Sequence, residues 1–576
     1  MYKAIPILVL LIAIFHSNLF AADSVCTEVR KTLDLNKIIQ EAESKGESHI
    51  TIAPGDYEID TTTVLYKKTN LTIDGTDVRL FVTKKIAAFL IEGCDTITIK
   101  GFTIDYDPIP FTQGTITKVE GGKDIYFTIH DGYPDLTEEN KYVCLYVFNP
   151  ETRRWKQGVA DVYGDMEVID GRHGYLRAKA NQPLVKAGDL ISINKRFKSC
   201  IFVSGGTQNL LMEDLTILSS PSIAIGGRFC GPNHRFNRIT IAKGTKPIGA
   251  TQERLVSTNA DGLNYAISNS SPLVENCDFG YMGDDGINFH GPHFPIIKVE
   301  SPSSFLTVRI QQKRPFKEVM SPGESLRHLD EKTYAILGDA TFKSIDAIYD
   351  HDLDPLFLKK HLGTYQKEYY KNCTVYRIQT EDPVEIKVGQ SMDFPALNCS
   401  GFIIRDSYFH DNRPRGLRLM SSNGLIENNR FERIRDSAIN IGNEYPHWAE
   451  AGWGEHIIIR NNTLSDIGLG NVFDSRNQIP AALCVFTMNA KGVKDYHAGH
   501  SNIVIENNKF NNCQPAAIYV YGARDVTIAD NVVKDSYSTN SAQAGSALSL
   551  GPRSAIDVHP KSQATLINNT ISTEEL

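Results

Sequence analysis

Residues 259–265 read Asn-Ala-Asp-Gly-Leu-Asn-Tyr, and residues 283–291 read Gly-Asp-Asp-Gly-Ile-Asn-Phe-His-Gly. The Asp-Gly pair recurs after 24 residues, and each pair leads into alternating hydrophobic residues. Self-similarity at such a period is typical of a solenoid, in which each coil stacks on the next. Because stacked parallel strands lie about 4.8 Å apart, Asp261 and Asp285 should meet, with Asp284 beside them. The sequence therefore predicts a cluster of three carboxylates.

Crowded carboxylates repel one another, so a fold that keeps them needs either a compensating interaction or a use for a protonated acid. Acid–base catalysis is our preferred interpretation of this cluster. The alternatives are that the Asp-Gly segments are ordinary turns, or that the three aspartates bind calcium. We predict catalytic roles for Asp261, Asp284 and Asp285, with no metal and no cofactor.

The repeat extends almost to the C-terminus. A polar residue is followed ten positions later by a small residue that opens an alternating strand, in the pairs Asn276 and Gly286, Asp406 and Gly416, Asn428 and Ala438, and Asn507 and Ala517. Asparagine and aspartate tolerate left-handed backbone and can form hydrogen-bonded ladders at the corners of a solenoid. The pattern predicts an all-β fold, a right-handed parallel β-helix.

The N-terminal residues have the pattern expected of an export signal. Lys3, an apolar run at 4–15 and the small residues Ala21 and Ala22 are typical of a secretory signal peptide. We expect an exported protein, periplasmic or secreted, without membrane insertion, since no other apolar run approaches the length of a membrane-spanning helix. A net charge of −8 without long charge runs argues against nucleic acid as a partner.

Two stretches interrupt the repeat with strand-like segments and long loops, and we interpret both as β-rich, barrel-like insertions. The expected division is a signal peptide at 1–22, an N-terminal cap and first coils at 23–107, an insertion at 108–198, coils with the aspartates at 199–291, a second insertion at 292–396, and C-terminal coils at 397–576. A short amphipathic helix at 34–43 should cap the open end of the solenoid.

Aligning the strands separates inward from outward residues. Hydrophobic Leu263, Ile287, Leu417, Ile439 and Ile518 form an inward column, and Asn264, Asn288, Arg418, Asn440 and Tyr519 form an outward one. An outward stripe of hydrogen-bonding groups beside carboxylates suits a sugar, although any solvated sheet face is polar. The predicted substrate-binding residues are Asn264, Asn288, His290, Arg415, Arg418, Glu444 and Trp448.

Two of these residues carry specific expectations. Arg415 should lie next to Asp285 and hold that carboxylate ionised. Trp448 belongs to the aromatic loop 443–456 and is expected to stack on a sugar, with a structural tryptophan as the ordinary alternative.

The pairing of residues 259–262 with residues 284–291, inside a β-helix with two β-rich insertions, resembles glycoside hydrolase family 110. The resemblance covers essentially the whole chain after the signal peptide. It implies an exported, exo-acting α-1,3-galactosidase that removes terminal galactose with inversion from blood-group-B-like or linear α-1,3-galactosyl glycans. Asp261, Asp284 and Asp285 match the three active-site aspartates of that family.

Two other functions remain open. A polygalacturonase-like glycosidase also combines Asn-x-Asp with Asp-Asp, but this chain has no separate Gly-His-Gly turn, and no Arg-x-Lys pair that would hold a uronate carboxylate lies near the aspartate segments, only Arg415 and Arg418. A non-catalytic, glycan-binding β-helix would have the same groove with dispensable carboxylates.

For an inverting enzyme we predict Asp284 as the general acid, with a pKa raised by its anionic neighbours, and Asp261 and Asp285 as the groups that position water. Acid and base should then stand about 6.5–9.5 Å apart.

Overall fold

A computed structural model of the 576-residue chain describes residues 30–137, 142–159, 161–310, 316–364, 366–445, 447–468, 481–487, 499–537 and 553–572. The expected signal peptide lies outside these residues. Within them, no helix has the length and apolar character needed to cross a membrane. The nine cysteines in this part of the chain are free thiols, and seven of them are buried.

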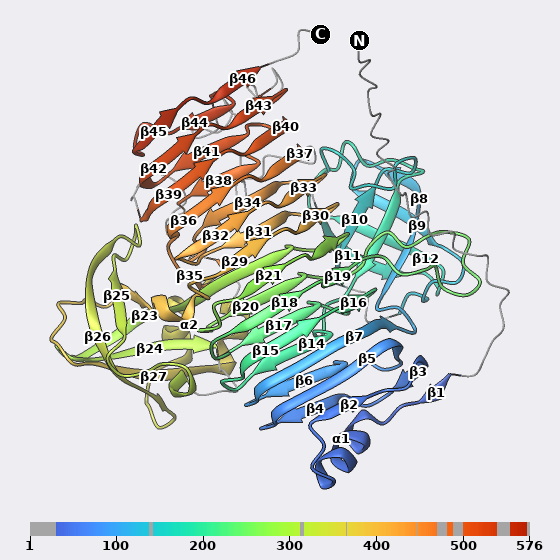
Figure 1. Ribbon diagram of the computed structural model, residues 1–576. Helices are drawn as coiled ribbons and strands as arrows, with labels where there is room; N and C mark the ends of the chain where they lie inside the picture. Colours follow the sequence, from blue (N-terminus) through green and yellow to red (C-terminus); the bar gives the residue numbers. More distant parts are fainter. Residues whose placement is uncertain are drawn as a thin grey trace, which may run out of the picture.

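The chain winds into a parallel β-helix, which confirms the predicted fold (Figure 1). Its strands form three stacks in which neighbours pair in parallel. The first stack contains β2 (His49–Thr51), β5 (Thr69–Val82), β7 (Asp95–Tyr106), β15 (Gln208–Glu213), β18 (His234–Asn237), β21 (Leu273–Glu275), β29 (Ile403–Arg405), β32 (Gly424–Glu427), β36 (Glu455–Arg460), β39 (His500–Glu506), β42 (Ala523–Ala529) and β45 (Ala564–Ile567).

The second stack shares the long strands β5 and β7 with the first. Its other members are β1 (Lys31–Thr32), β3 (Gly55–Ile59), β16 (Thr216–Ile217), β19 (Thr240–Ile241), β22 (Asp278–Gly280), β30 (Tyr408–His410), β33 (Arg430–Glu432), β37 (Thr463–Ile467), β40 (Lys509–Cys513), β43 (Val532–Lys534) and β46 (Thr570–Ser572).

The third stack, called the site stack below, carries the two quoted segments. It contains β4 (Thr63–Tyr66), β6 (Phe89–Glu92), β14 (Ile201–Ser204), β17 (Ile225–Arg228), β20 (Leu263–Ala266), β23 (Ile287–Ser301), β31 (Arg415–Leu419), β34 (Ser437–Gly442), β38 (Leu483–Phe486), β41 (Ile518–Tyr521) and β44 (Ile556–Val558). Helix α1 (Leu35–Ser44) precedes the first coils, and Asp34 caps its N-terminus by accepting from Lys37 N at 3.0 Å.

The register of the site stack follows the predicted columns. Leu263 pairs with Ile287, Ile287 with Leu417, and Leu417 with Ile439, and all four are buried in the core of the helix. The backbones approach closely where each strand begins. A Cβ added to Gly286 would lie 2.4 Å from the carbonyl oxygen of Gly416, so the small residues that open these strands are required by the packing.

Asparagines build the corners in two ways. Asn428 and Asn507 both have positive φ, 59° and 55°, so they occupy equivalent left-handed corners, as predicted. The residue after each corner forms a buried ladder, in which each backbone N–H and side-chain amide donates to the Oδ1 of the next member, along Asn429, Asn462, Asn508, Asn531 and Asn569. The sequence pattern identified the corners but not this separate ladder.

The first insertion is a closed antiparallel barrel of six strands. It consists of β8 (Phe111–Glu120), β9 (Asp124–Ile129), β10 (Tyr142–Phe148), β11 (Val162–Val168), β12 (His173–Ala178) and β13 (Leu190–Asn194). The barrel has a hydrophobic core of its own, separate from that of the helix.

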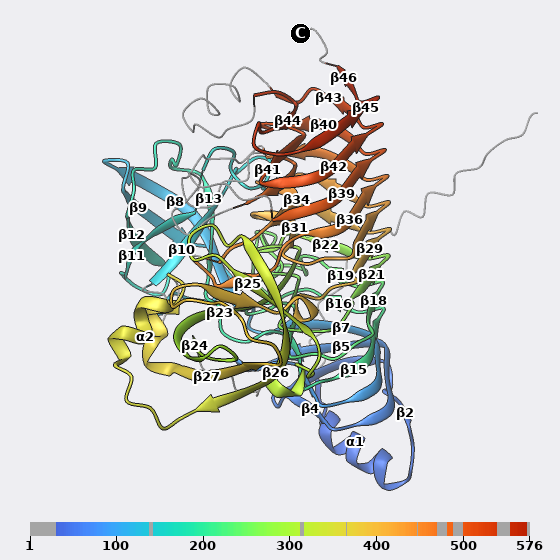
Figure 2. The same cartoon turned by 90° about the vertical axis from the view of Figure 1, so that its left-hand side faces the viewer.

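The second insertion grows out of the site stack itself, because β23 continues past Gly291 into antiparallel pairs. It contains β24 (Ser304–Ile310), β25 (Ser325–Leu329), β26 (Ile336–Ile348), β27 (Cys373–Thr380), β28 (Ser391–Asp393), the 3-10 turns η2 (Phe316–Glu318), η3 (Gln366–Asn372) and η4 (Pro395–Leu397), and helix α2 (Pro355–His361). Figure 2 shows both insertions on the side of the helix away from β18, β21 and β29. They therefore flank the site stack.

The outward column is less exposed than the sequence predicts. Asn440 is buried, and Tyr519 is fully buried in a satellite cluster with Cys484 and Tyr521 outside the core of the helix. Both positions are buried, so neither belongs to a solvated sheet face.

Candidate active site

The three aspartates meet at the start of two neighbouring strands. Asp261 precedes β20, and Asp284 and Asp285 precede β23, the next strand of the site stack. One carboxylate oxygen of each lies within 4.8 Å of the others. The backbone N–H of Asp285 also donates to Asp261 Oδ1 at 3.2 Å. The register of the two strands thus brings together the cluster that the 24-residue repeat predicts.

Arginines surround this cluster. Arg415 lies beside Asp285 as expected and binds it with both arms, Nε to Oδ1 at 2.6 Å and Nη2 to Oδ2 at 3.0 Å. Asp284 is held by two further arginines: Arg196 donates to Oδ2, and Arg413 Nη2 donates to Oδ1 at 3.2 Å. Sequence reasoning missed both, because neither belongs to a column of the repeat.

The barrel contributes to this arrangement. Arg196 follows β13, where the chain leaves the barrel, and Asp161 precedes β11. Asp161 forms an ion pair with Arg413 and accepts from Arg435 Nη1 at 2.9 Å. The barrel therefore supplies one direct partner of Asp284 and one residue that fixes the other partner.

These contacts separate the pKa values of the aspartates. Burial raises the pKa of Asp261 to about 8, and the charges of Asp284 and Asp285 add to the shift. Burial also disfavours the ionised form of Asp284, but Arg196 and Arg413 outweigh it and hold its pKa well below the usual value. For Asp285, burial raises the pKa and Arg415 opposes the rise. The expectation of a raised pKa at Asp284 is wrong, because its arginine partners lie outside the repeat.

The arginines around the cluster argue against the alternative that the three aspartates bind calcium. Arg196, Arg413 and Arg415 bring three guanidinium charges to three carboxylates, so the cluster has its counter-charges within the protein. A divalent cation at the same place would compete with these ion pairs.

The outward column beside the aspartates is buried and incompletely hydrogen-bonded. Asn264, Asn288 and Arg418 pair in register on β20, β23 and β31 and are 4–6% exposed. Asn264 donates its amide to Asp261. Asn264 Oδ1, Asn288 Oδ1 and Arg418 Nε have no hydrogen-bond partner among the described residues. Buried polar groups rarely remain unpaired, so these atoms indicate a polar ligand.

Arg418 connects this column to two glutamates. Its Nη2 lies 3.2 Å from Glu444 Oε2 and 3.3 Å from Glu450 Oε2. Glu450, which the sequence did not indicate, arrives through β35 (Glu450–Ala451), a two-residue strand antiparallel to β23. His290 Nε2 lies 3.6 Å from Glu450, and burial lowers the pKa of His290 to about 4, so this contact joins a neutral imidazole to a carboxylate.

The two tryptophans of the loop 443–456 differ in their surroundings. Trp453 is fully buried and packs edge-on against His500, as a structural tryptophan does. Trp448 is half-buried and lies edge-on to His447, with the ring centroids 4.7 Å apart. A sugar-binding role for Trp448 stays a prediction.

Comparison with known proteins identifies relatives of this chain. A family model described as a right-handed β-helix region matches residues 367–571. α-1,3-Galactosidase B of Akkermansia muciniphila is 21% identical over 492 residues, which cover 81% of this chain and 56% of that protein. α-1,3-Galactosidase B of Bacteroides thetaiotaomicron is 24% identical over 425 residues, which cover 69% of this chain and 64% of that protein. In both cases the chain spans less than two thirds of the relative's own length.

Further similarities are to another curated relative and to a solved structure. α-1,3-Galactosidase A of Shewanella woodyi is 21% identical over 462 residues, covering 77% of this chain and 69% of that protein. Among solved structures, the catalytic domain of a GH87 α-1,3-glucanase in complex with nigerose has a TM-score of 0.42 and 12% identity, covering 95% of this chain and 65% of that one. The curated relatives confirm the resemblance first carried by the paired aspartate segments. The chain is a β-helix protein that is similar in sequence, at 21–24% identity, to curated α-1,3-galactosidases A and B.

Proposed function

We propose that the chain is an exo-acting glycoside hydrolase that removes terminal α-1,3-linked galactose from glycans, blood-group-B-like or linear. The names of its relatives support the linkage and the sugar. We also propose that the protein is exported, on the strength of the signal-like residues 1–22.

The observation that carries the proposal is the set of unpaired buried polar atoms beside the carboxylates. Asn264 Oδ1, Asn288 Oδ1 and Arg418 Nε all lack a hydrogen-bond partner among the described residues. Leaving a buried polar group unsatisfied costs about 1–3 kcal/mol. A sugar presents hydroxyls that both donate and accept, so one ligand can satisfy the amide oxygens together with the guanidinium N–H.

The pKa values favour roles for the aspartates that differ from those expected. Asp261 keeps its proton at neutral pH, which suits the general acid that protonates the glycosidic oxygen as the bond to the anomeric carbon breaks. Asp284 stays ionised, which suits the base that takes a proton from the attacking water. Asp285 and Arg415 hold the neighbouring side of the cluster in place.

Inversion is part of this proposal. Both oxygens of Asp284 and both of Asp285 accept hydrogen bonds from arginines, so neither carboxylate has an oxygen without a partner for direct attack on the anomeric carbon. Water is then the better nucleophile. The nearest carboxylate oxygens, within 4.8 Å, lie closer than the expected separation of an inverting pair, so the stereochemistry needs a direct test.

Galactose release from an α-1,3-linked galactosyl disaccharide tests the activity, with the α-1,4- and α-1,6-linked disaccharides as controls. We expect release from the first only, and its loss in the Asp261→Asn and Asp284→Asn variants. Proton NMR of the fresh product tests the stereochemistry: β-galactose first supports inversion, and α-galactose first contradicts it. Cleavage of polygalacturonate instead would favour the polygalacturonase-like alternative, and binding without turnover would favour a glycan-binding module.

A further inference from the structure

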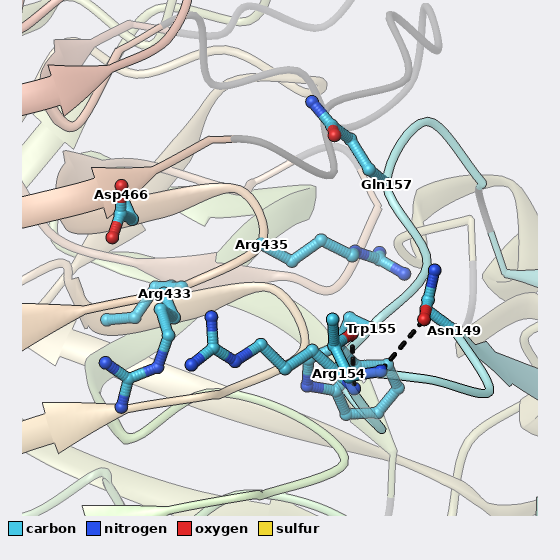
Figure 3. A pocket seen from close by; sticks show the side chains of 9 residues that line it. Asn149, Arg154, Trp155, Gln157, Arg433, Arg435 and Asp466 are labelled. Atoms are coloured by element: carbon cyan, nitrogen blue, oxygen red, sulfur yellow. Dashed lines mark hydrogen bonds between the residues drawn. The ribbon is translucent and has the colours of Figure 1, made fainter.

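A pocket of about 310 Å³ lies where the barrel meets the β-helix (Figure 3). The barrel lines it through the loop between β10 and β11, which includes Arg154, Trp155 and Gln157, and the helix lines it with Arg433 and Arg435. We infer that this pocket binds the neutral saccharide on the reducing side of the cleaved bond. The inference rests on the proposed function and names the part of the substrate that the aspartate cluster does not hold.

Trp155 gives the pocket a preformed aromatic surface. Its indole Nε1 donates to the backbone oxygen of Asp411 at 2.7 Å. Its ring packs on Phe148 with centroids 4.4 Å apart and lies edge-on to Tyr146 at 5.5 Å. These three contacts fix the indole before a ligand arrives. A fixed aromatic ring with hydrogen-bonding side chains around it is a usual lining for a saccharide site.

The charges around the pocket favour a neutral ligand. Arg433 binds Asp411 with Nε and Nη2, and Arg435 binds Asp161. Arg154 Nε lies 3.9 Å from Asp411 Oδ1, and its side chain is 56% exposed. Because these guanidinium groups already face carboxylates, an anion entering the pocket would meet little uncompensated positive charge. Hydroxyl groups need only hydrogen-bond donors and acceptors, which Arg154 and Gln157 provide.

One layer of ion pairs separates the pocket from the aspartate cluster. Arg435 lines the pocket and binds Asp161, and Asp161 also binds Arg413, which donates to Asp284. Asp284 is also more open than Asp285, with 16% against 2% of the side chain exposed. The terminal galactose would lie along the stripe of Asn264, Asn288 and Arg418. The remaining sugars would then leave past Asp284 toward the barrel.

Substrate length tests the inference. The Arg154→Ala/Gln157→Ala variant should cleave galactosyl-α-1,3-lactose with kcat/KM reduced about tenfold, as expected for about two lost hydrogen bonds. Cleavage of nitrophenyl α-galactoside, which has no saccharide on the reducing side, should stay unchanged. The control is Arg177→Ala, since Arg177 is also an exposed barrel arginine but lies on β12, away from the pocket. Equal effects on both substrates, or none on either, would overturn the inference.

Binding provides a readout that does not require turnover. Lactose should bind the wild-type chain and the Arg177→Ala control in calorimetric titration, and should bind the double variant about tenfold more weakly. Undiminished binding to the double variant would refute the inference even if no galactosidase activity is found, so its failure and that of the proposed function are distinguishable. Competition by inorganic sulfate would contradict the assignment to neutral sugars.

Discussion

Replacing Asp261 by asparagine should stabilise the protein at neutral pH while abolishing turnover. In the folded chain the pKa of Asp261 is raised to about 8, whereas an unfolded aspartate titrates near 3.9. Between these values the unfolded state releases the proton and the folded state retains it. Raising the pH through this window therefore destabilises the fold by about 1.4 kcal/mol per pH unit, or about 4 kcal/mol at pH 7.

Asparagine does not titrate, so Asp261→Asn should gain stability over the wild type as the pH rises from 4 to 8, by about 4 kcal/mol at pH 7 and about 5 kcal/mol at pH 8. Unfolding by guanidinium, followed by tryptophan fluorescence at pH 5, 7 and 8, measures the gain as a growing difference in free energy of unfolding. Asp165→Asn, at an exposed position on β11, is the control and should show no such trend. A difference between Asp261→Asn and wild type that is constant across this range would refute the reasoning.

Three further predictions concern other contacts. Asp161→Asn removes the carboxylate that Arg413 and Arg435 share and leaves them only Asp284 and Asp436, respectively; we expect a loss of about 3–5 kcal/mol in unfolding free energy and a larger fall in kcat than rise in KM. Asn288→Ala removes an amide whose partnerless Oδ1 we assign to the sugar, so kcat/KM should fall about tenfold while the melting temperature changes little. Asn508→Ala deprives Asn462 of its acceptor and should lower the unfolding free energy by about 2–4 kcal/mol, measured by chemical denaturation, without changing KM.

The sequence predicts what the repeat itself determines. The 24-residue offset and the alternation of side chains were sufficient to bring Asp261 to Asp285 and to place Arg415 and Arg418, because parallel strands in register carry sequence position directly into space. The same logic predicted Asn428 and Asn507 as corners, since both residues need the left-handed backbone that asparagine tolerates.

The partners that decide the chemistry lie outside the repeat. Arg196 reaches Asp284 only because the barrel returns its chain to that point, and Arg413 lies on a turn before β31. Glu450 arrives on a two-residue antiparallel strand that carries no periodic signal. Nothing in the sequence places Arg196 and Arg413 beside Asp284. The pKa of Asp284 is therefore predicted to be raised, whereas these arginines lower it in the structure.

The asparagine ladder also affects how a chain of this kind can change in length. Each coil contacts mainly the coils before and after it, and the amides of Asn508 and Asn531 offer each neighbour the same donors and acceptors. A coil duplicated or deleted between them would leave the ladder continuous. The aspartates, which precede β20 and β23, would keep every contact described here. Evolution can therefore vary the number of C-terminal coils independently of the chemistry, and relatives are expected to differ there in coil number more than near the aspartates.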